Sequence, residues 1–180
     1  MKEIEVKLLE IKKDEVIKKL EEMGAEKVSD GEMNVLIYDF ADERLSRNSD
    51  FVRLRGYDGD SVLAFKRKIS KGSTKIMEEY EVKVDNYNNM KYILKNMGLK
   101  VIRDYSKHRT SYKLGKVHFD IDTIPEIPTF MEIEAIDEGG HLEEKEKLLK
   151  QCQEYLNLFG IKDTDLIECS YSDLILNKMS

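Results

Sequence analysis

The sequence predicts an α+β fold in which a closed antiparallel β-barrel of about eight strands carries amphipathic helices packed outside. Seven segments alternate between charged and apolar residues with the period of two that is typical of strands. Three other segments carry apolar residues at helical spacing. A chain of 180 residues has the length of one domain, so we expect residues 1–180 to form a single unit.

Each predicted strand has one charged face. In chain order these faces carry Glu3, Glu5 and Lys7; Arg53 and Arg55; Lys66 and Lys68; Glu79, Glu81 and Lys83; Arg103, Lys107 and Arg109; Asp120 and Asp122; and Glu132 and Glu134. For any single strand, the solvated face of an ordinary sheet is the simpler interpretation. Seven such faces that separate into acidic and purely basic sets favour a sheet that closes, with the charges lining its interior.

The helices are predicted from apolar stripes and their end signals. They are expected at about residues 14–24, 86–98 and 142–160, with a short last helix at 170–176. Asp14 is placed to cap the first helix, and Gly24 and Gly98 are placed to end the first two. These stripes supply the cover that the outer face of a barrel needs.

Composition excludes several classes of protein. Acidic residues (36) outnumber basic ones (30), and the net charge of −6 disfavours a general nucleic-acid binder. No apolar stretch approaches the roughly 18 residues of a membrane span, and the N-terminal segment lacks the apolar core of a signal peptide. We therefore expect a soluble, cytoplasmic protein without a membrane partner. Cys152 and Cys169 have neither metal-ligand nor redox spacing and are interpreted as reduced thiols.

A barrel interior lined by both signs of charge permits a specific chemistry. Clustered carboxylates need a hard cation, and oxygen ligands suit magnesium, manganese or calcium. Clustered arginines and lysines need an anion with many oxygens, and guanidinium groups fit phosphate in a bidentate way. A polyphosphate bridged to a divalent metal satisfies both sets. The chain has no Walker-type glycine-rich loop, and His108, His118 and His141 stand in no ligand pattern.

These residues, in this order, resemble the CYTH superfamily of triphosphate tunnel metalloenzymes. The resemblance rests on Glu3-x-Glu5-x-Lys7, Arg53-x-Arg55, Lys66, Lys107-x-Arg109, Asp122 and Glu132-x-Glu134, and it extends to the C-terminal SYSDLI segment. The chain is most similar to the class IV adenylyl cyclase branch. One departure is the pair Pro125 and Pro128, where the family often has a glycine-rich turn.

The resemblance implies roles for these residues. The implied ligands of Mg2+ or Mn2+ are Glu3, Glu5, Asp122, Glu132 and Glu134. The implied contacts to the triphosphate are Lys7, Arg53, Arg55, Lys66, Lys107 and Arg109. Among all of these, Glu5, Lys7 and Arg55 are the expected catalytic residues. The expected partner is a small-molecule triphosphate: ATP, tripolyphosphate or thiamine triphosphate.

Several alternatives stay open at this stage. Within one site, ATP could be cyclised to cyclic AMP and pyrophosphate, or a triphosphate could be hydrolysed. A non-catalytic module that binds polyphosphate or nucleotides would need the cations but not the carboxylates. An RNA-binding protein could use the basic segment 66–75, although that segment has no aromatic residue for base stacking. The oligomeric state is also open, with a homodimer among the options.

Overall fold

The fold is described from a computed structural model. It covers residues 2–8, 10–57, 59–69, 75–137, 150, 154–155, 157–159 and 166–167. For residues 2–8, 75–76, 135–137 and 166–167 the description extends to the backbone and its pairing only.

Strands dominate the described chain. The elements are β1 (Lys2–Leu8), α1 (Lys13–Glu22), β2 (Glu26–Phe40), α2 (Arg44–Arg47), β3 (Asp50–Tyr57), β4 (Asp60–Lys68), β5 (Lys75–Lys83), α3 (Tyr87–Asn96), β6 (Leu99–Leu114), β7 (Val117–Thr123), β8 (Phe130–Asp137) and β9 (Leu166–Ile167).

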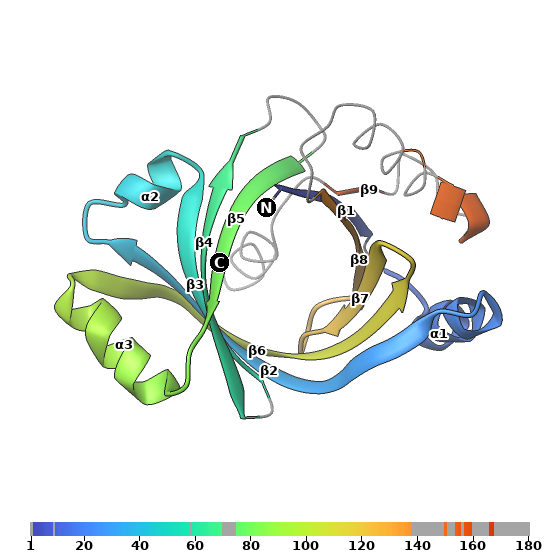
Figure 1. The fold of residues 1–180 in the computed structure, drawn as a ribbon, viewed down its shortest axis with the longest axis horizontal. Helices are drawn as coiled ribbons and strands as arrows, with labels where there is room; N and C mark the ends of the chain where they lie inside the picture. The colour runs from blue at the N-terminus through green and yellow to red at the C-terminus, as the bar shows by residue number, and fades with distance from the viewer. Residues whose placement is uncertain are drawn as a thin grey trace.

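The strands form one antiparallel sheet that closes on itself. Along the sheet the order is β5-β4-β3-β2-β6-β7-β8-β1-β9, and β5 also pairs with β1. In that pairing Lys2 is opposite Glu78 and Glu5 is opposite Lys75, while Lys7 and Leu8 pair with β9 on the same edge of β1. Strands β1 to β8 therefore encircle a common interior, as Figure 1 shows. The predicted closed barrel with helices outside is confirmed.

Strand β2 is the one that the alternation of charge did not reveal. Its residues 35–38 are Val-Leu-Ile-Tyr, with no polar position between them. Leu36 and Tyr38 pack with Leu94 of α3, whereas Val35 and Ile37 belong to a separate cluster on the opposite face. Because both faces of β2 are buried along residues 35–38, this stretch carries no period of two. With the seven predicted strands, β2 completes the ring of eight.

The helices cover the outside of the barrel. Val16 and Leu20 of α1 pack on outward side chains of β6, β7 and β8, including Phe119 and Ile133. Leu94 of α3 packs on the other side of the ring, over β2 and β3. Figure 1 shows α1 at one side of the barrel and α2 and α3 at the opposite side.

The helix boundaries differ from expectation at one end. α1 begins at Lys13, and the capping position is Lys12, whose side chain makes no cap hydrogen bond. Asp14 therefore lies in the first turn, where a carboxylate still interacts favourably with the helix dipole. Asn86 does cap α3, since its side-chain oxygen accepts a hydrogen bond from the Asn89 N–H at 2.9 Å.

The C-terminal predictions fall mostly outside the described residues. Residues 150, 154–155 and 157–158 are helical, in agreement with the third predicted helix. The short last helix at 170–176 and both cysteines lie outside the described part. Within that part, no helix has the length and apolar character that crossing a bilayer requires.

Candidate functional site

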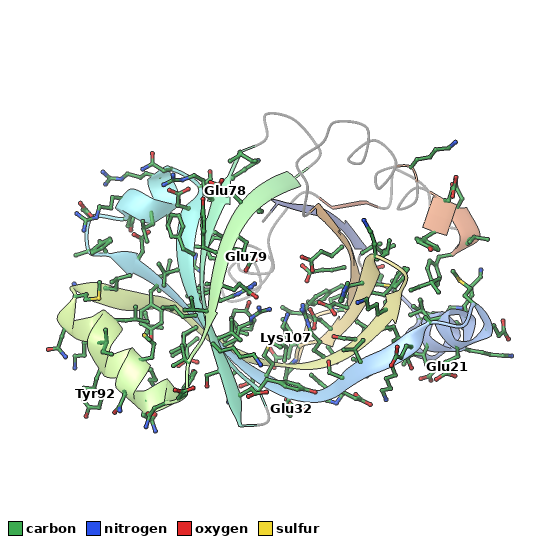
Figure 2. All side chains as sticks on the ribbon, in the orientation of Figure 1. Glu21, Glu32, Glu78, Glu79, Tyr92 and Lys107 are labelled. Carbon is green, nitrogen blue, oxygen red and sulfur yellow. The ribbon has the colours of Figure 1, made fainter. Side chains whose placement is uncertain are left out.

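On the strands whose side chains are described, the charged faces point into the barrel. The opposite faces of the same strands hold the apolar residues on which α1 and α3 pack, such as Phe119 and Leu54. Several inward charged side chains are withdrawn from solvent: Lys107 is 5% exposed, Glu79 is 2% exposed and Asp122 is fully buried. Figure 2 shows Lys107 and Glu79 on the inner side of the ring and Tyr92 on the outside. The solvated-face interpretation is therefore wrong for the parts of β5, β6 and β7 that carry these three side chains.

One ion-pair network spans β3, β4 and β5. Arg53 Nη2 contacts Glu79 Oε1 at 2.8 Å and Glu81 Oε1 at 3.2 Å. Arg55 contacts Glu81, and Lys66 Nζ lies 2.5 Å from Glu79 Oε2. Glu79 and Glu81 thus hold three cations. These are Arg53, Arg55 and Lys66, which the family resemblance assigned to the triphosphate.

A second network spans β6, β7 and β8. Arg109 Nη2 contacts Asp122 Oδ2 at 2.5 Å and Glu132 Oε2 at 2.8 Å, and Arg109 Nη1 contacts Asp120. Lys107 Nζ donates to Asp122 Oδ2 at 2.7 Å. All these groups lie on adjacent strands in direct register, with Arg109 opposite Asp122 and Asp120 opposite Glu132. We call this set, Lys107, Arg109, Asp120, Asp122 and Glu132, the β6–β8 network, and the preceding set the β3–β5 network.

Burial shifts the pKa values in the β6–β8 network. Burial and the neighbouring Arg109 cation lower the pKa of Lys107 to about 8, although Asp122 and Glu132 act in the opposite sense. Burial alone would raise the pKa of Asp122, but Arg109 and Lys107 hold it below its ordinary value. Asp122 is therefore a charged carboxylate that orients two cations.

Arg55 is the least compensated guanidinium of the β3–β5 network. Burial, followed by repulsion from Arg53, lowers the pKa of Arg55, whereas Glu79 and Glu81 raise that of Arg53 in spite of burial. Both side chains stay charged, because a guanidinium in a protein does not lose its proton. An incoming polyanion would thus relieve repulsion at Arg55.

Strand β1 lies between the two networks on the side of the ring opposite β2. Glu5 is opposite Glu134 and Lys7 is opposite Glu132 in the β1–β8 register. The side chains of Glu3, Glu5 and Lys7 lie outside the described part, so their predicted roles stay predictions. Register nevertheless brings carboxylate-bearing positions of β1, β8 and β7 into one neighbourhood.

The donor set of this neighbourhood fits a hard divalent cation, because it consists of carboxylate oxygens only. No group of three potential metal ligands assembles among the described side chains. There, Asp120, Asp122 and Glu132 are all engaged by Arg109. A metal site at this place therefore depends on the acidic residues of β1, or on release of carboxylates from Arg109.

The inner face of β2 carries no charge. Its residues are Gly31, Met33, Val35 and Ile37, and Tyr57 of β3 lies so close to Gly31 that an added Cβ would be 3.2 Å from its hydroxyl oxygen. This uncharged stretch of the inner face, residues 31–37, separates the β3–β5 network from the β6–β8 network.

Some inward residues received no role from the sequence. Glu79, Glu81 and Asp120 were placed on charged faces, and the structure shows that they hold the cations. Tyr57 and Tyr105 were not singled out, although each shares the parity of inward cations on its own strand. Of the histidines, His118 faces inward opposite Glu134 with a pKa lowered by burial, and His108 lies on the outer face 3.4 Å from Asp30.

Known proteins share this sequence pattern and this fold. A Methanocaldococcus jannaschii protein, provisionally named an adenylate cyclase, is 28% identical over 97% of this chain and 98% of its own. A solved Pyrococcus horikoshii structure has a TM-score of 0.80 and 24% identity, and the match covers 96% of this chain and 98% of that one. A Hippeastrum protein has a TM-score of 0.61 and 18% identity, with 88% of both chains covered. Its structure is described as that of a provisionally named adenylyl cyclase with a dominant triphosphatase activity.

The family assignment rests on nearly the whole chain. The model of the CYTH domain matches residues 1–171, which include every strand of the barrel and all the predicted site residues. The family match agrees with the architecture, which is a closed barrel with ion-pair networks on its inner side. The chain belongs to the CYTH family.

Proposed function

We propose that this protein is a divalent-metal-dependent enzyme that acts on a triphosphate inside the barrel, and that its reaction is the conversion of ATP to cyclic AMP and pyrophosphate. The observation that carries the proposal is the convergence of buried cations from both networks on one interior, each cation held by carboxylates. The name of the Methanocaldococcus jannaschii relative, which matches almost the full length of both chains, supports the cyclase reaction.

The inward cations bind the phosphates in this proposal. Arg53, Arg55 and Lys66 approach from one side of the barrel, Lys107 and Arg109 from the other, and Lys7 from β1. Glu79 and Asp122 hold four of these cations in position before substrate arrives. Prior orientation of this kind reduces the reorganisation that binding and the transition state would otherwise require.

In cyclisation, the ribose 3′-oxygen forms a bond to the α-phosphorus while the bond from that phosphorus to the bridging oxygen of pyrophosphate breaks. The proton of the 3′-hydroxyl passes to solvent, and the departing pyrophosphate carries the negative charge of the broken bond. Glu3, Glu5, Asp122, Glu132 and Glu134 would hold Mg2+ or Mn2+. Such a metal neutralises phosphate charge and lowers the pKa of the hydroxyl. Arg55, the least compensated guanidinium, stabilises charge on the leaving pyrophosphate.

Hydrolysis of the terminal phosphate is the second candidate. The dominant triphosphatase activity described for the Hippeastrum protein favours it, because that protein has a similar fold. In this case water replaces the ribose hydroxyl as the nucleophile and attacks the terminal phosphorus. The same cations stabilise either transition state, so the position of the substrate decides the product.

Product analysis separates these reactions. Purified protein is incubated with ATP, tripolyphosphate or thiamine triphosphate in the presence of Mg2+ or Mn2+, and the products are resolved by chromatography. Cyclic AMP with an equal amount of pyrophosphate supports cyclisation. ADP with orthophosphate, or faster cleavage of tripolyphosphate, identifies a hydrolase.

A substitution tests the proposed site itself. Arg55→Gln should abolish turnover, whereas Arg47→Gln, at an exposed position on α2, should not. Full activity of Arg55→Gln would contradict the proposed site.

A further inference from the structure

Tyr105 connects two apolar groups on the inner side of the barrel. It packs against the cluster of Met33, Val35 and Ile37 on β2. It also packs against Ile124 and Phe130, at the end of β7 and the start of β8. The ring of Tyr105 therefore lies where apolar side chains of β2, of the end of β7 and of the start of β8 meet.

The connection between β7 and β8 supports this surface. It is the segment that contains Pro125 and Pro128, and its Ile127 packs against Ile124 and Phe130, as Tyr105 does. The Ile127 N–H donates to the Ile124 carbonyl at 3.2 Å, which closes a turn. Two prolines restrict the backbone of such a turn, so the apolar side chains are held in place.

Arg103 adjoins Tyr105 on the same face of β6 and differs from the other inward arginines. Its Nη1 donates to the carbonyl of Ile102 at 2.8 Å, and its Nε is buried without a hydrogen-bond acceptor. No ion pair joins Arg103 to a carboxylate among the described side chains, whereas Arg53, Arg55 and Arg109 each have at least one. The guanidinium of Arg103 is thus left available to a ligand.

This region is continuous with the cations that bind phosphate in the proposed function. Ile37 is the register partner of Arg53 on one side and of Arg103 on the other. With strands about 4.8 Å apart, the Cα atoms of these two arginines lie roughly 10 Å from each other. The Tyr105 hydroxyl is also close enough to Arg53 to help raise the pKa of that guanidinium.

We propose that Arg103 and Tyr105 form a subsite for the aromatic base of a nucleoside triphosphate, with the ring of Tyr105 and the guanidinium of Arg103 stacking on the base. Both groups stack on planar aromatic systems. A bare tripolyphosphate has no apolar part that could use this surface. The inference rests on the proposed function and extends it, since it makes the substrate a nucleotide.

The test compares two ligands in which a methylene group replaces a bridging oxygen between phosphorus atoms. Neither ligand can be cleaved at that bridge. Binding of α,β-methylene ATP and of methylene-bridged tripolyphosphate is measured by calorimetry in the presence of Mg2+. Arg103→Gln and Tyr105→Leu should each weaken binding of the ATP analogue about tenfold, as expected for lost stacking, and change tripolyphosphate binding less than about twofold. Leucine keeps the apolar packing of Tyr105, so the variant should fold.

Matched controls are Arg47→Gln and Tyr80→Leu, because Arg47 is exposed and Tyr80 is 57% exposed on the outer side of β5. Both should bind each ligand like the unmodified protein. Equal losses for the two ligands, or no loss, in Arg103→Gln and Tyr105→Leu would overturn the subsite alone. If the unmodified protein bound neither ligand, the proposed function would fail and the subsite with it.

Discussion

Arg55 illustrates how much of the site depends on the shape of a side chain as well as its charge. Its guanidinium is the least compensated of the β3–β5 network, and its described acidic contact is Glu81. A guanidinium can bind two phosphate oxygens at once, whereas an ammonium group acts as a point charge.

Arg55→Lys should therefore lower kcat/KM at least about tenfold although the charge is kept. Steady-state kinetics with the best of the three triphosphates provides the measurement. Arg47→Lys, on the exposed surface of α2, is the control and should leave kinetics unchanged. Equal kinetics for Arg55→Lys and the unmodified protein would place Arg55 outside the substrate site.

Asp122 has a structural role in the β6–β8 network, where it joins the two cations. It is fully buried and contacts both Lys107 and Arg109. Asp122→Asn leaves these buried cations with less compensation, so the free energy of unfolding should fall by about 3 kcal/mol or more. Urea denaturation measures the change, with the exposed Asp42→Asn as the control.

The same reasoning predicts partial rescue. Lys107→Met in the Asp122→Asn background removes one of the uncompensated cations and should recover part of the lost stability. An unchanged denaturation midpoint for Asp122→Asn would show that the cations find other partners.

At the scale of elements, Asp39 at the end of β2 organises the start of α2. It is fully buried, and its carboxylate accepts hydrogen bonds from the N–H groups of Phe40 (2.7 Å), Leu45 (3.1 Å) and Ser46 (2.9 Å) and from the Ser46 hydroxyl (2.5 Å). Burial would raise the pKa of Asp39, but these hydrogen bonds hold it below its ordinary value of 3.8.

A carboxylate with a depressed pKa stabilises the fold above its unfolded-state pKa and loses that contribution as pH falls through the folded-state value. Wild-type stability should therefore decrease below about pH 4. Asp39→Asn should cost about 1–3 kcal/mol at pH 7, and its difference from wild type should shrink as the solution is acidified. Urea denaturation from pH 7 to pH 3 measures both, and a difference that is constant with pH would contradict the role of the charge.

At the scale of the whole molecule, barrel closure places opposite charges in one interior. The pairing of β5 with β1 brings the first and fifth strands together and removes two sheet edges. On its other edge, β1 pairs with β8, and this pairing sets the acidic positions of the two strands beside each other, with Glu5 opposite Glu134. An anionic substrate would be repelled by such positions until a cation neutralises them.

Removal of divalent metal should therefore abolish turnover, and adding back Mg2+ or Mn2+ should restore it. Activity is measured with excess chelator and then with each metal in excess. Glu134→Gln should remove the metal-dependent activity while the melting temperature holds or rises, because a carboxylate leaves an acidic neighbourhood. Undiminished turnover in chelator would remove the metal from the proposed function.

The sequence by itself determined the fold class, most of the strands and the charged face of each strand from β3 to β8. Alternation of charge on β1 and β3 to β8 is a local property, because strand geometry sends successive side chains to opposite faces. For the same reason the period of two alone assigns Arg53, Lys66, Lys107 and Arg109 each to the charged face of its own strand. Strand β2 was not predicted because residues 35–38 are apolar on both faces. This stretch therefore shows no alternation of charged and apolar residues.

Only the tertiary structure decided which charges meet. The pairing of Arg53 with Glu79, and of Arg109 with Asp120, Asp122 and Glu132, depends on strand order and register, which join residues 11 to 26 positions apart. It likewise left Arg103 without a carboxylate among the described side chains and set Tyr105 against Ile124 and Phe130, on which Ile127 of the proline-containing turn also packs. Contacts across a closed sheet follow from how the strands pair, and charge periodicity within a single strand holds no information about its neighbours.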